Sequence, residues 1–411
     1  MADPDNTPEE AEGPAPEPLL APAEGVPPVL VAPAEFAAAA ERLAAGTGPI
    51  AVDTERASGF RYSQRAYLVQ LRRAGSGTVL IDPIEHPDAL DSVIAALDGP
   101  EWVLHAADQD LPCLRELGMR CATVYDTELA GRLLGMNRVN LAAMTAHFLG
   151  RELRKGHGAA DWSKRPLPDD WLNYAALDVE LLVELRDAMD AQLRAAGKQE
   201  WAAQEFDYIL RRPPAPPRPD RWRRTSNIHS LKTQRQLAAV RELWLSREEL
   251  AAQRDVAPGR VLPDAAIVDA AQSDPKTVDE LTRLKVFGGP RQRRHARRWF
   301  AALQRARDLP EQDLPARKAP ASGLPPVNRW DQRNPEAAAR AAVVRPAVAD
   351  VAESVSVPAE NLLSPELVRQ LCWTGVAPDP AAVDEALAAG WARPWQRDLT
   401  RDAIAAALAQ L

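Results

Sequence analysis

The segment PIAVDTERASGF, residues 49–60, begins as a buried strand and continues into two acidic side chains. Ile50 and Val52 are apolar, and Asp53 and Glu55 follow two positions apart. Residues two apart in a strand point to the same side, so the two carboxylates are expected side by side at the end of an apolar strand. Like charges this close raise each other's pKa and cost stability. Because the pair costs stability, its presence indicates a functional rather than a structural role.

The composition is that of a globular protein with more than one domain. A chain of 411 residues is too long for a single ordinary hydrophobic core, so two or three domains are expected. Its 46% hydrophobic and 26% charged residues are typical of soluble globular proteins. No stretch predicts a membrane span, and the acidic, proline-rich start lacks the pattern of a signal peptide. Three cysteines, an odd number without metal-type spacing, predict a cytoplasmic location and no disulfide framework.

The charge is unevenly distributed along the chain. The net charge is −8, yet residues 211–308 contain 22 lysines and arginines against 11 aspartates and glutamates. Residues 1–49 contain 1 against 9. The negative mean argues against a nucleic-acid partner, but the basic middle segment is compatible with one.

Strand and helix patterns alternate between residues 29 and 210, which predicts one α/β domain. A hairpin is expected where two strand patterns flank Gly75-Ser76-Gly77, and a long amphipathic helix region is expected over residues 168–197. The rest of the chain is predicted as a disordered tail (1–28), a proline-rich linker (211–228), a helical bundle (229–308), a second linker (309–356) and a C-terminal helical domain (357–411).

Further acidic positions follow the opening pair. In VLHAADQDLPCL, Asp110 stands just past a strand end, and Asp108 is a competing candidate two residues earlier. In NYAALDVELL, Tyr174 and Asp178 are four apart and share one helix face. Asp126, in YDTELA, is a fifth acidic position near a strand-to-helix junction.

Four carboxylates that converge on one point can bind two hard divalent cations through oxygen ligands. Such a metal pair stabilises the attacking and leaving oxygens of a phosphodiester displacement, and it removes the repulsion between the acids. Each signal also has a simpler interpretation: a solvated strand end for Asp-x-Glu, a helix-terminal acid for Asp110, and an ordinary helix face for Tyr174 with Asp178. Only the order of the motifs favours the metal site. His105 is interpreted as a structural histidine.

This ordered set resembles the ribonuclease D family, in the tyrosine subtype of the DEDD superfamily of 3′-to-5′ exonucleases. VDTE, LHAADQDL and YAALDVELL resemble its three motifs, and the runs YDTELAGRLLG and ADWSKRPLPDDWLNYAALD also fit. The resemblance implies a ribonuclease H-like fold, a mixed sheet flanked by helices. It selects Asp110 over Asp108, because the family's acid immediately precedes the Leu. The implied metal ligands are Asp53, Glu55, Asp110 and Asp178, with Tyr174 positioning water and with two divalent ions, Mg²⁺ or Mn²⁺, as cofactors.

The bundle over residues 229–308 resembles the HRDC domain, a nucleic-acid-binding module, and the C-terminal helical domain is consistent with a second, degenerate copy. The run RQRRHARRWF places five arginines within about two helical turns. We interpret them as phosphate contacts, with a solvated helix face as the alternative: Arg291, Arg293, Arg294, Arg297 and Arg298.

The function implied by the resemblance is 3′-to-5′ trimming of structured RNA, tRNA precursors in particular, with release of nucleoside 5′-monophosphates. The same chemistry on DNA and a catalytically silent RNA-binding scaffold are the alternatives. A third alternative, a helicase accessory factor, has no support, because no Gly-x-x-x-x-Gly-Lys-Ser/Thr loop occurs in the sequence. No nucleotide cofactor is expected. No membrane partner is expected, and the sequence does not define an oligomeric state.

Overall fold

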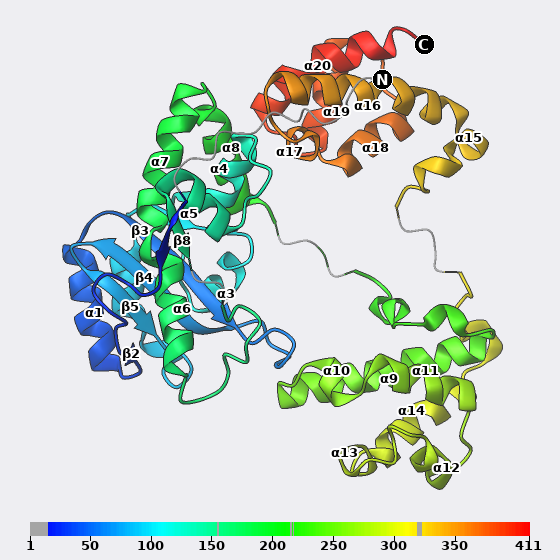
Figure 1. Cartoon of the computed structure of the whole chain (residues 1–411). Helices are drawn as coiled ribbons and strands as arrows, with labels where there is room; N and C mark the ends of the chain where they lie inside the picture. Colours follow the sequence, from blue (N-terminus) through cyan, green and yellow to red (C-terminus); the bar gives the residue numbers. More distant parts are fainter. Residues whose placement is uncertain (1–14, 154–155, 214–215, 217, 319–322) are drawn as a thin grey trace, which may run out of the picture. The chain divides into compact units, whose positions relative to one another are not determined.

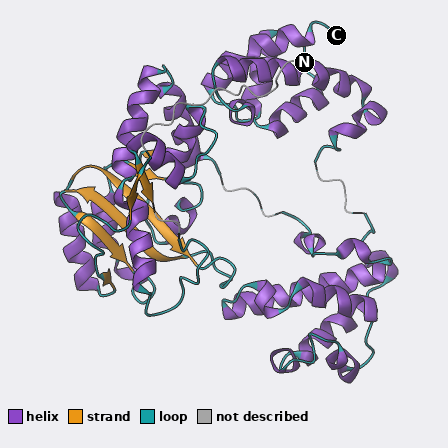
Figure 2. Ribbon diagram, viewed as in Figure 1, coloured by secondary structure: helices purple, strands orange, loops and turns teal. Residues whose placement is uncertain are grey.

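The computed structural model describes residues 15–411 except 154–155, 214–215, 217 and 319–322. The chain forms two compact units. The first unit comprises the described residues up to Glu55, Ala66–Arg212 and Leu324–Leu411, and the second unit comprises Arg56–Arg65 and Pro213–Gly323. Figure 2 shows a sheet with flanking helices in the first unit and, in the described part of the second, helices joined by loops.

A six-stranded mixed sheet forms the centre of the α/β domain in the first unit (Figure 1). Its strands, in spatial order, are β2 Val29–Leu30, β5 Gly77–Ile81, β4 Ala66–Ala74, β3 Thr47–Arg56, β6 Trp102–Leu104 and β7 Val124–Asp126. β5 is antiparallel to β4 and parallel to β2, and β6 is parallel to β3 and β7. The predicted hairpin between β4 and β5 is confirmed, and Gly75 and Gly77 supply the positive φ that its turn requires.

Strand β3 lies between β4 and β6, so both of its edges are hydrogen-bonded to neighbouring strands. Ile50, Ala51 and Val52 are fully buried, and Ile50 pairs with Trp102 of β6. Burial on both faces explains why this part of the strand is a continuous apolar run rather than an alternating one. The two acids follow the residues that pair with β6 and so stand at the carboxyl end of the strand.

Helices pack beside this sheet. They are α1 Pro33–Ala45, α2 Asp91–Leu97, α3 Leu111–Glu116, α4 Thr127–Leu133, α5 Leu141–Leu149, α6 Asp169–Glu180, α7 Leu182–Ala195 and α8 Gln199–Arg211. α6 contacts β4 and β5, α7 contacts β6, and α8 contacts β7. The helix region predicted over residues 168–197 is divided between α6 and α7 at Leu181, whose φ of −111° and ψ of 5° leave helical geometry. The predicted fold class, a mixed sheet with helices followed by helical domains, is confirmed.

The disordered tail predicted through residue 28 is corrected for its last part. Strand β1 Glu17–Leu19 pairs in parallel with β8 Arg151–Leu153. Further along, the Ala23 amide donates to Glu180 Oε1 at 3.0 Å. A proline-rich, acidic segment can thus be ordered when its backbone groups find partners on a folded domain. The first 14 residues of the predicted tail lie outside the described residues.

The second linker, predicted over residues 309–356, is also corrected. Residues 335–354 form α16, a long helix with Pro346 in its interior, and the buried side chains of Val344 and Val348 belong to the core. Proline in a helix costs one backbone hydrogen bond, and α16 nevertheless continues through Pro346. The other α-helices of this C-terminal domain are α15 Trp330–Arg333, α17 Ala359–Leu362, α18 Pro365–Thr374, α19 Pro380–Ala389 and α20 Pro394–Leu408.

The C-terminal domain packs on α8 of the α/β domain. Arg393 donates to both carboxylate oxygens of Glu205, at 2.7 and 2.8 Å, and the Trp395 indole donates to the same acid at 2.8 Å. Trp395 stacks on Trp201 with ring centroids 5.0 Å apart. One cluster of buried apolar side chains therefore continues from the sheet into these C-terminal helices.

The second unit has its own apolar core around the long helix α9. Its α-helices are α9 Gln234–Arg254, α10 Pro258–Val261, α11 Asp264–Ser273, α12 Val278–Arg283, α13 Pro290–Arg293 and α14 Ala296–Asp308. A short 3₁₀-helix, η2 Arg221–Arg224, packs on α9 through the buried Trp222, so the first predicted linker ends earlier than residue 228.

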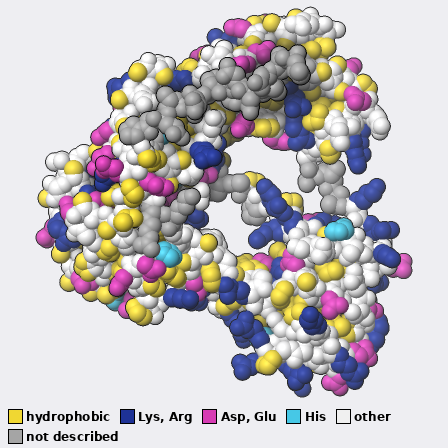
Figure 3. Space-filling view, in the orientation of Figure 1, with side chains coloured by type: hydrophobic (Ala, Val, Ile, Leu, Met, Phe, Trp, Pro, Cys, Tyr) yellow, Lys and Arg dark blue, Asp and Glu magenta, His cyan; other side chains and the backbone are white. Residues whose placement is uncertain are grey.

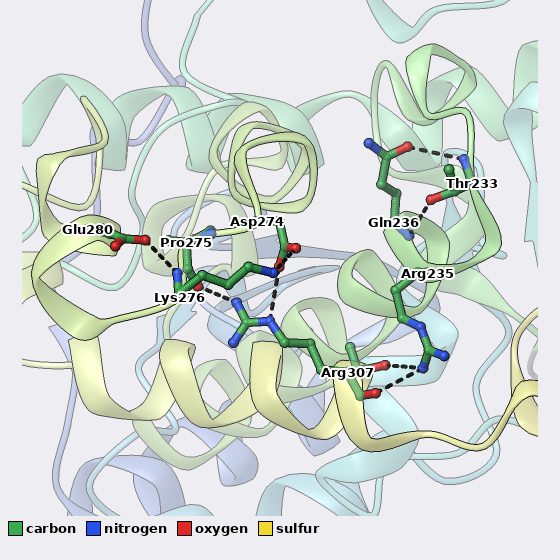
Figure 4. A network of polar contacts seen from close by, with 9 residues as sticks. Thr233, Arg235, Gln236, Asp274, Pro275, Lys276, Glu280 and Arg307 are labelled. Carbon is green, nitrogen blue, oxygen red and sulfur yellow. Dashed lines mark hydrogen bonds and ion pairs between the residues drawn. The ribbon is translucent and has the colours of Figure 1, made fainter.

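Polar contacts join the helices of the second unit (Figure 4). Thr233 and Gln236 form a capping box at the start of α9. Arg235 donates to the Ala306 and Arg307 carbonyls at the end of α14, each at 3.1 Å. The Arg307 side chain in turn donates to Asp274 at 2.9 Å. Several arginines of this basic unit therefore serve its fold.

Candidate active site

Three of the predicted acids meet at the carboxyl end of β3. One ligand oxygen from each of Asp53, Glu55 and Asp178 lies within 4.8 Å of the others. β3 supplies the first two through strand alternation, and α6 supplies Asp178 from the helix that lies against β4 and β5. The group thus combines residues more than 120 positions apart in the chain.

Asp110 stands beside this group at the N-terminus of α3. It is 5% exposed, and its side chain does not cap the helix. Instead, the Thr54 hydroxyl donates to Asp110 Oδ1 at 2.6 Å, and Cys113 Sγ lies 3.2 Å from the same hydroxyl. The helix-terminal interpretation of Asp110 therefore does not describe its side chain. Thr54 was missed from the sequence because alternation alone places it on the opposite side from its two acidic neighbours.

Burial and mutual repulsion disfavour the ionised acids. Burial raises the pKa of Asp53 well above its usual 3.8, and the charges of Asp110, Asp178 and Glu55 raise it further. Burial likewise raises the pKa of Asp178 to about 7, although a hydrogen bond from Tyr174 opposes the shift. These carboxylates would ionise fully near neutral pH only with added positive charge, which is what a bound cation supplies.

Tyr174 lies one helical turn from Asp178 on α6 and is hydrogen-bonded to it. Burial, and then the charge of Asp178, raise the phenol pKa well above 10. The hydroxyl therefore keeps its proton and acts as a hydrogen-bond donor.

A glycine-containing segment, residues 156–162, lies over the Tyr174 ring. A Cβ atom built on Gly156 would stand 2.5 Å from Tyr174 Cδ2, a distance that real side chains do not adopt. The His157 ring lies 6.0 Å from the Tyr174 ring and, through Nε2, 3.1 Å from Asp170 Oδ2. The buried Trp162 donates to the His157 carbonyl at 3.3 Å. Sequence reasoning missed these neighbours because the approach depends on tertiary packing, although the Gly-His-Gly run is a signal for it.

The remaining candidates have structural partners. Asp126 is 1% exposed and caps α4, accepting from the backbone amides of Glu128 and Leu129 at 2.9 and 3.2 Å. Burial raises its pKa to about 6 despite these bonds. Asp108 is half exposed and pairs with Arg212 at 3.2 Å. His105 Nδ1 lies 2.9 Å from Thr127 Oγ1, and burial lowers its pKa to about 4.

The five arginines predicted to contact phosphates lie on and between α13 and α14 of the second unit. Arg293, Arg294 and Arg297 are exposed, and Figure 3 shows Lys and Arg side chains gathered over this unit. Arg291, also exposed, lies 3.4 Å from the Arg260 carbonyl. Arg298 differs because its guanidinium donates to Ser246 and Glu249, which ties α14 to α9.

Fold and site together define a 3′–5′ exonuclease of the DEDD superfamily. Residues 29–194 match the family described as 3′-5′ exonuclease, and residues 236–303 match the HRDC domain. Residues 323–408 match the 3′ to 5′ exonuclease C-terminal domain. The suggestion that this last region is a second HRDC-like copy stays a prediction.

Similar proteins narrow this class. Ribonuclease D of Shewanella sp. (strain ANA-3) is 30% identical over 262 residues, covering 62% of this chain and 67% of the relative. The crystal structure of a protein from Bifidobacterium adolescentis superposes with a TM-score of 0.87 and 38% identity, covering 96% of this chain and all of that one. Escherichia coli RNase D superposes with a TM-score of 0.65 and 25% identity, covering 93% and 98%. The chain belongs to the ribonuclease D family.

The family membership defines the activity at the level of reaction and polymer. The protein is a hydrolytic 3′–5′ exoribonuclease, and Asp53, Glu55 and Asp178 form a group of carboxylates with the geometry to hold a metal ion. None of the helices within the described ranges has both the length and the apolar character needed to span a bilayer.

Proposed function

We propose that Asp53, Glu55, Asp110 and Asp178 bind two divalent ions, Mg²⁺ or Mn²⁺, at the carboxyl end of β3. The observation that carries this proposal is the approach of three carboxylates to within 4.8 Å with Asp110 beside them. Oxygen donors are the ligands that hard cations prefer. The raised pKa values of Asp53 and Asp178 fit the same site, because positive charge there would relieve the repulsion.

The chain's own residues then determine how water meets the phosphodiester. When bound, the two ions stabilise the attacking and leaving oxygens of the displacement. Tyr174 keeps its proton and, held by Asp178, orients the water for attack on the terminal phosphate. Cleavage between phosphorus and the 3′ oxygen releases a nucleoside 5′-monophosphate.

We further propose that the substrates are the 3′ ends of structured RNA, tRNA precursors in particular. Support comes from family membership and from E. coli RNase D, described as an exoribonuclease involved in structured RNA processing. Exposed arginines of the second unit would contact phosphates without reading sequence: Arg291, Arg293, Arg294 and Arg297. Arg298 would contribute less, since it is already paired. The odd number of three cysteines, without metal-type spacing, supports a cytoplasmic location.

Labelled strands test the proposal. Purified protein is incubated with RNA and DNA oligonucleotides labelled at either end, with Mg²⁺, with Mn²⁺ or with EDTA. We expect 3′-labelled RNA to release labelled mononucleotide at once, 5′-labelled RNA to shorten progressively, and EDTA to stop both. Faster shortening of DNA than of RNA would favour the alternative in which DNA is the substrate. Binding of RNA without shortening under any metal would favour the scaffold alternative.

A further inference from the structure

A cavity of about 450 Å³ lies in the second unit, between η2 and the side of α9. Its lining includes four arginines and one tryptophan: Arg218, Arg221, Arg224, Arg247 and Trp244. We call this cavity the arginine pocket. It is separate from the α13–α14 arginines, none of which lines it.

The floor of the arginine pocket is built from a buried charge. Arg247 is 5% exposed, and its Nη1 donates to Asp264 Oδ1 at 2.6 Å and to the Leu262 carbonyl at 3.1 Å. Its Nη2 lies 3.5 Å from Glu248 Oε1. Asp264 and Glu248, the two acids of the lining, both contact this guanidinium, although Glu248 Oε2 is buried and has no hydrogen-bond partner among the described residues. The Nε of Arg247 is buried and has no hydrogen-bond partner among the described residues, so one donor on the floor is unused.

The rim of the arginine pocket carries exposed positive charge. In a 3₁₀-helix, residues three apart lie on the same side, which places Arg221 and Arg224 together on η2. These two and Arg218 are exposed, and within the described part of the chain none of the three has an acidic partner. Arg223, on another side of η2, is tied to Asp220 at 3.3 Å and lies over the Trp222 ring. The three rim arginines are thus exposed cations without an acidic partner among the described residues, whereas Arg247 on the floor is held by the fold.

An aromatic ring stands among these charges. The Arg221 guanidinium lies 5.7 Å from the centre of the Trp244 ring, and that of Arg247 lies 6.0 Å from it. Cationic groups beside an aromatic face are the combination that single-stranded nucleic acid uses, with phosphates on the arginines and a base against the planar groups. A small inorganic anion would need only one or two of these groups.

We propose that the arginine pocket binds a single-stranded segment of the RNA substrate, with phosphodiester groups on Arg221 and Arg224. The inference rests on the proposed function, because it takes RNA as the ligand of this chain. It adds a second RNA contact in the same unit, independent of α13 and α14. The arginine pocket then holds the strand by its backbone, while hydrolysis takes place at the carboxylates of the first unit.

The test compares two double variants of the full-length protein. Arg221→Ala/Arg224→Ala removes two charges from the pocket rim, and Arg283→Ala/Lys285→Ala removes two exposed charges of the same unit outside the pocket. Binding of fluorescent single-stranded RNA is titrated against salt in EDTA, which prevents degradation. We expect the pocket variant to lose about tenfold in affinity and its slope of log K against log salt to fall by about 1.4, or 0.7 per lost contact. The control should keep the wild-type slope.

Each outcome separates the inference from the function on which it rests. Equal losses of RNA affinity in both variants would indicate a general charge effect and would overturn the proposal that the pocket binds RNA. A wild-type salt slope in the pocket variant would overturn it as well. Turnover at low RNA concentration should fall with the affinity in the pocket variant and stay at the wild-type value in the Arg283→Ala/Lys285→Ala control. If the unmodified protein cuts RNA but the pocket variant binds it normally, only the pocket inference fails. If the unmodified protein neither cuts nor binds RNA, both fail.

Discussion

The carboxylate cluster and the arginine pocket both gather like charges, but they do so in opposite surroundings. Asp53, Glu55 and Asp178 converge in a buried to half-buried site, and burial, then repulsion, raises the pKa of Asp53. The rim arginines of the pocket are exposed, and water screens them at little cost. Buried like charges therefore need a tightly held counter-charge, whereas exposed ones remain available for a partner that comes and goes. This difference matches a resident metal site and a transient phosphate contact.

The largest effect is expected from Asp53→Asn, which tests whether the carboxylate cluster holds the catalytic metal. Loss of one metal-binding carboxylate should lower turnover by about 10³-fold or more, because metal stabilisation of the transition state is worth several kcal/mol. RNA affinity should persist, since the proposed phosphate contacts lie in the second unit. Asp108→Asn is the matched control, because Asp108 is half exposed and pairs with Arg212. Turnover and binding are measured separately, and near-normal turnover in Asp53→Asn would remove the metal assignment.

Tyr174→Phe tests the role of the hydroxyl separately from that of the carboxylates. The change removes one hydroxyl while the ring and the carboxylates stay, so it should slow the chemical step by about 10²-fold. Metal affinity should change little. Single-turnover rates and a Mn²⁺ titration check both points. An unchanged rate would assign Tyr174 to packing alone.

The cost of the buried acids should appear directly in the metal-free protein. The folded state raises the pKa of Asp178 from its ordinary 3.8 to about 7, so between these values the folded protein binds more protons than the unfolded chain. Stability should therefore fall as pH rises through this window, by about 2 kcal/mol after allowance for partial exposure. Mg²⁺ or Mn²⁺ should reverse the loss at pH 8.

Calorimetric melting at pH 5 and pH 8 in EDTA measures this effect, and Asp178→Asn is its control. The variant lacks one titrating group, so the pH dependence should become smaller, while Asp53 and Asp126, whose pKa values burial also raises, keep part of it. A metal-free protein that melts equally at both values would show that the cluster carries no such cost.

The sequence predicted the parts of the molecule that obey short-range rules. Strand alternation placed Asp53 beside Glu55, and helix periodicity placed Tyr174 one turn from Asp178. Local rules alone did not assign Asp110 to the site, because Asp108 fits the same local pattern. Only the resemblance to the family motif distinguished the two aspartates. The structure then supplied a physical difference, burial and a hydrogen bond from Thr54 at 2.6 Å.

Long-range pairing was not predictable in this way. Glu205 and Arg393 are 188 residues apart, yet their ion pair joins the C-terminal domain to α8. A cut near residue 213, which the proline-rich segment suggests as a domain boundary, would remove Arg393 and leave the buried Glu205 carboxylate without its cation. The proline-rich segment therefore does not mark an end of the first unit. The core of that unit includes residues that precede this segment and residues that follow it in the chain.

The smallest expected effect comes from the segment over Tyr174. In Gly156→Ala the new methyl would stand 2.5 Å from Tyr174 Cδ2, so either the segment or the ring must move. Gly156 is exposed, and its segment can yield in part, so we expect kcat to fall by about tenfold with KM little changed. Gly158→Ala is the control, because its methyl would lie at an ordinary 3.5 Å from the Tyr174 hydroxyl.

A double variant separates misplacement of the hydroxyl from general damage. If Gly156→Ala acts by displacing the Tyr174 hydroxyl, it should cost much less in a Tyr174→Phe background, where that hydroxyl is already gone. Single-turnover rates of the four proteins close the cycle. Additive losses would show that the methyl harms the site by another route, such as disturbing the Asp178 carboxylate. Coupling of about tenfold would establish that the glycine is needed to let the segment approach the phenol, and that this approach holds the hydroxyl where the water must be oriented.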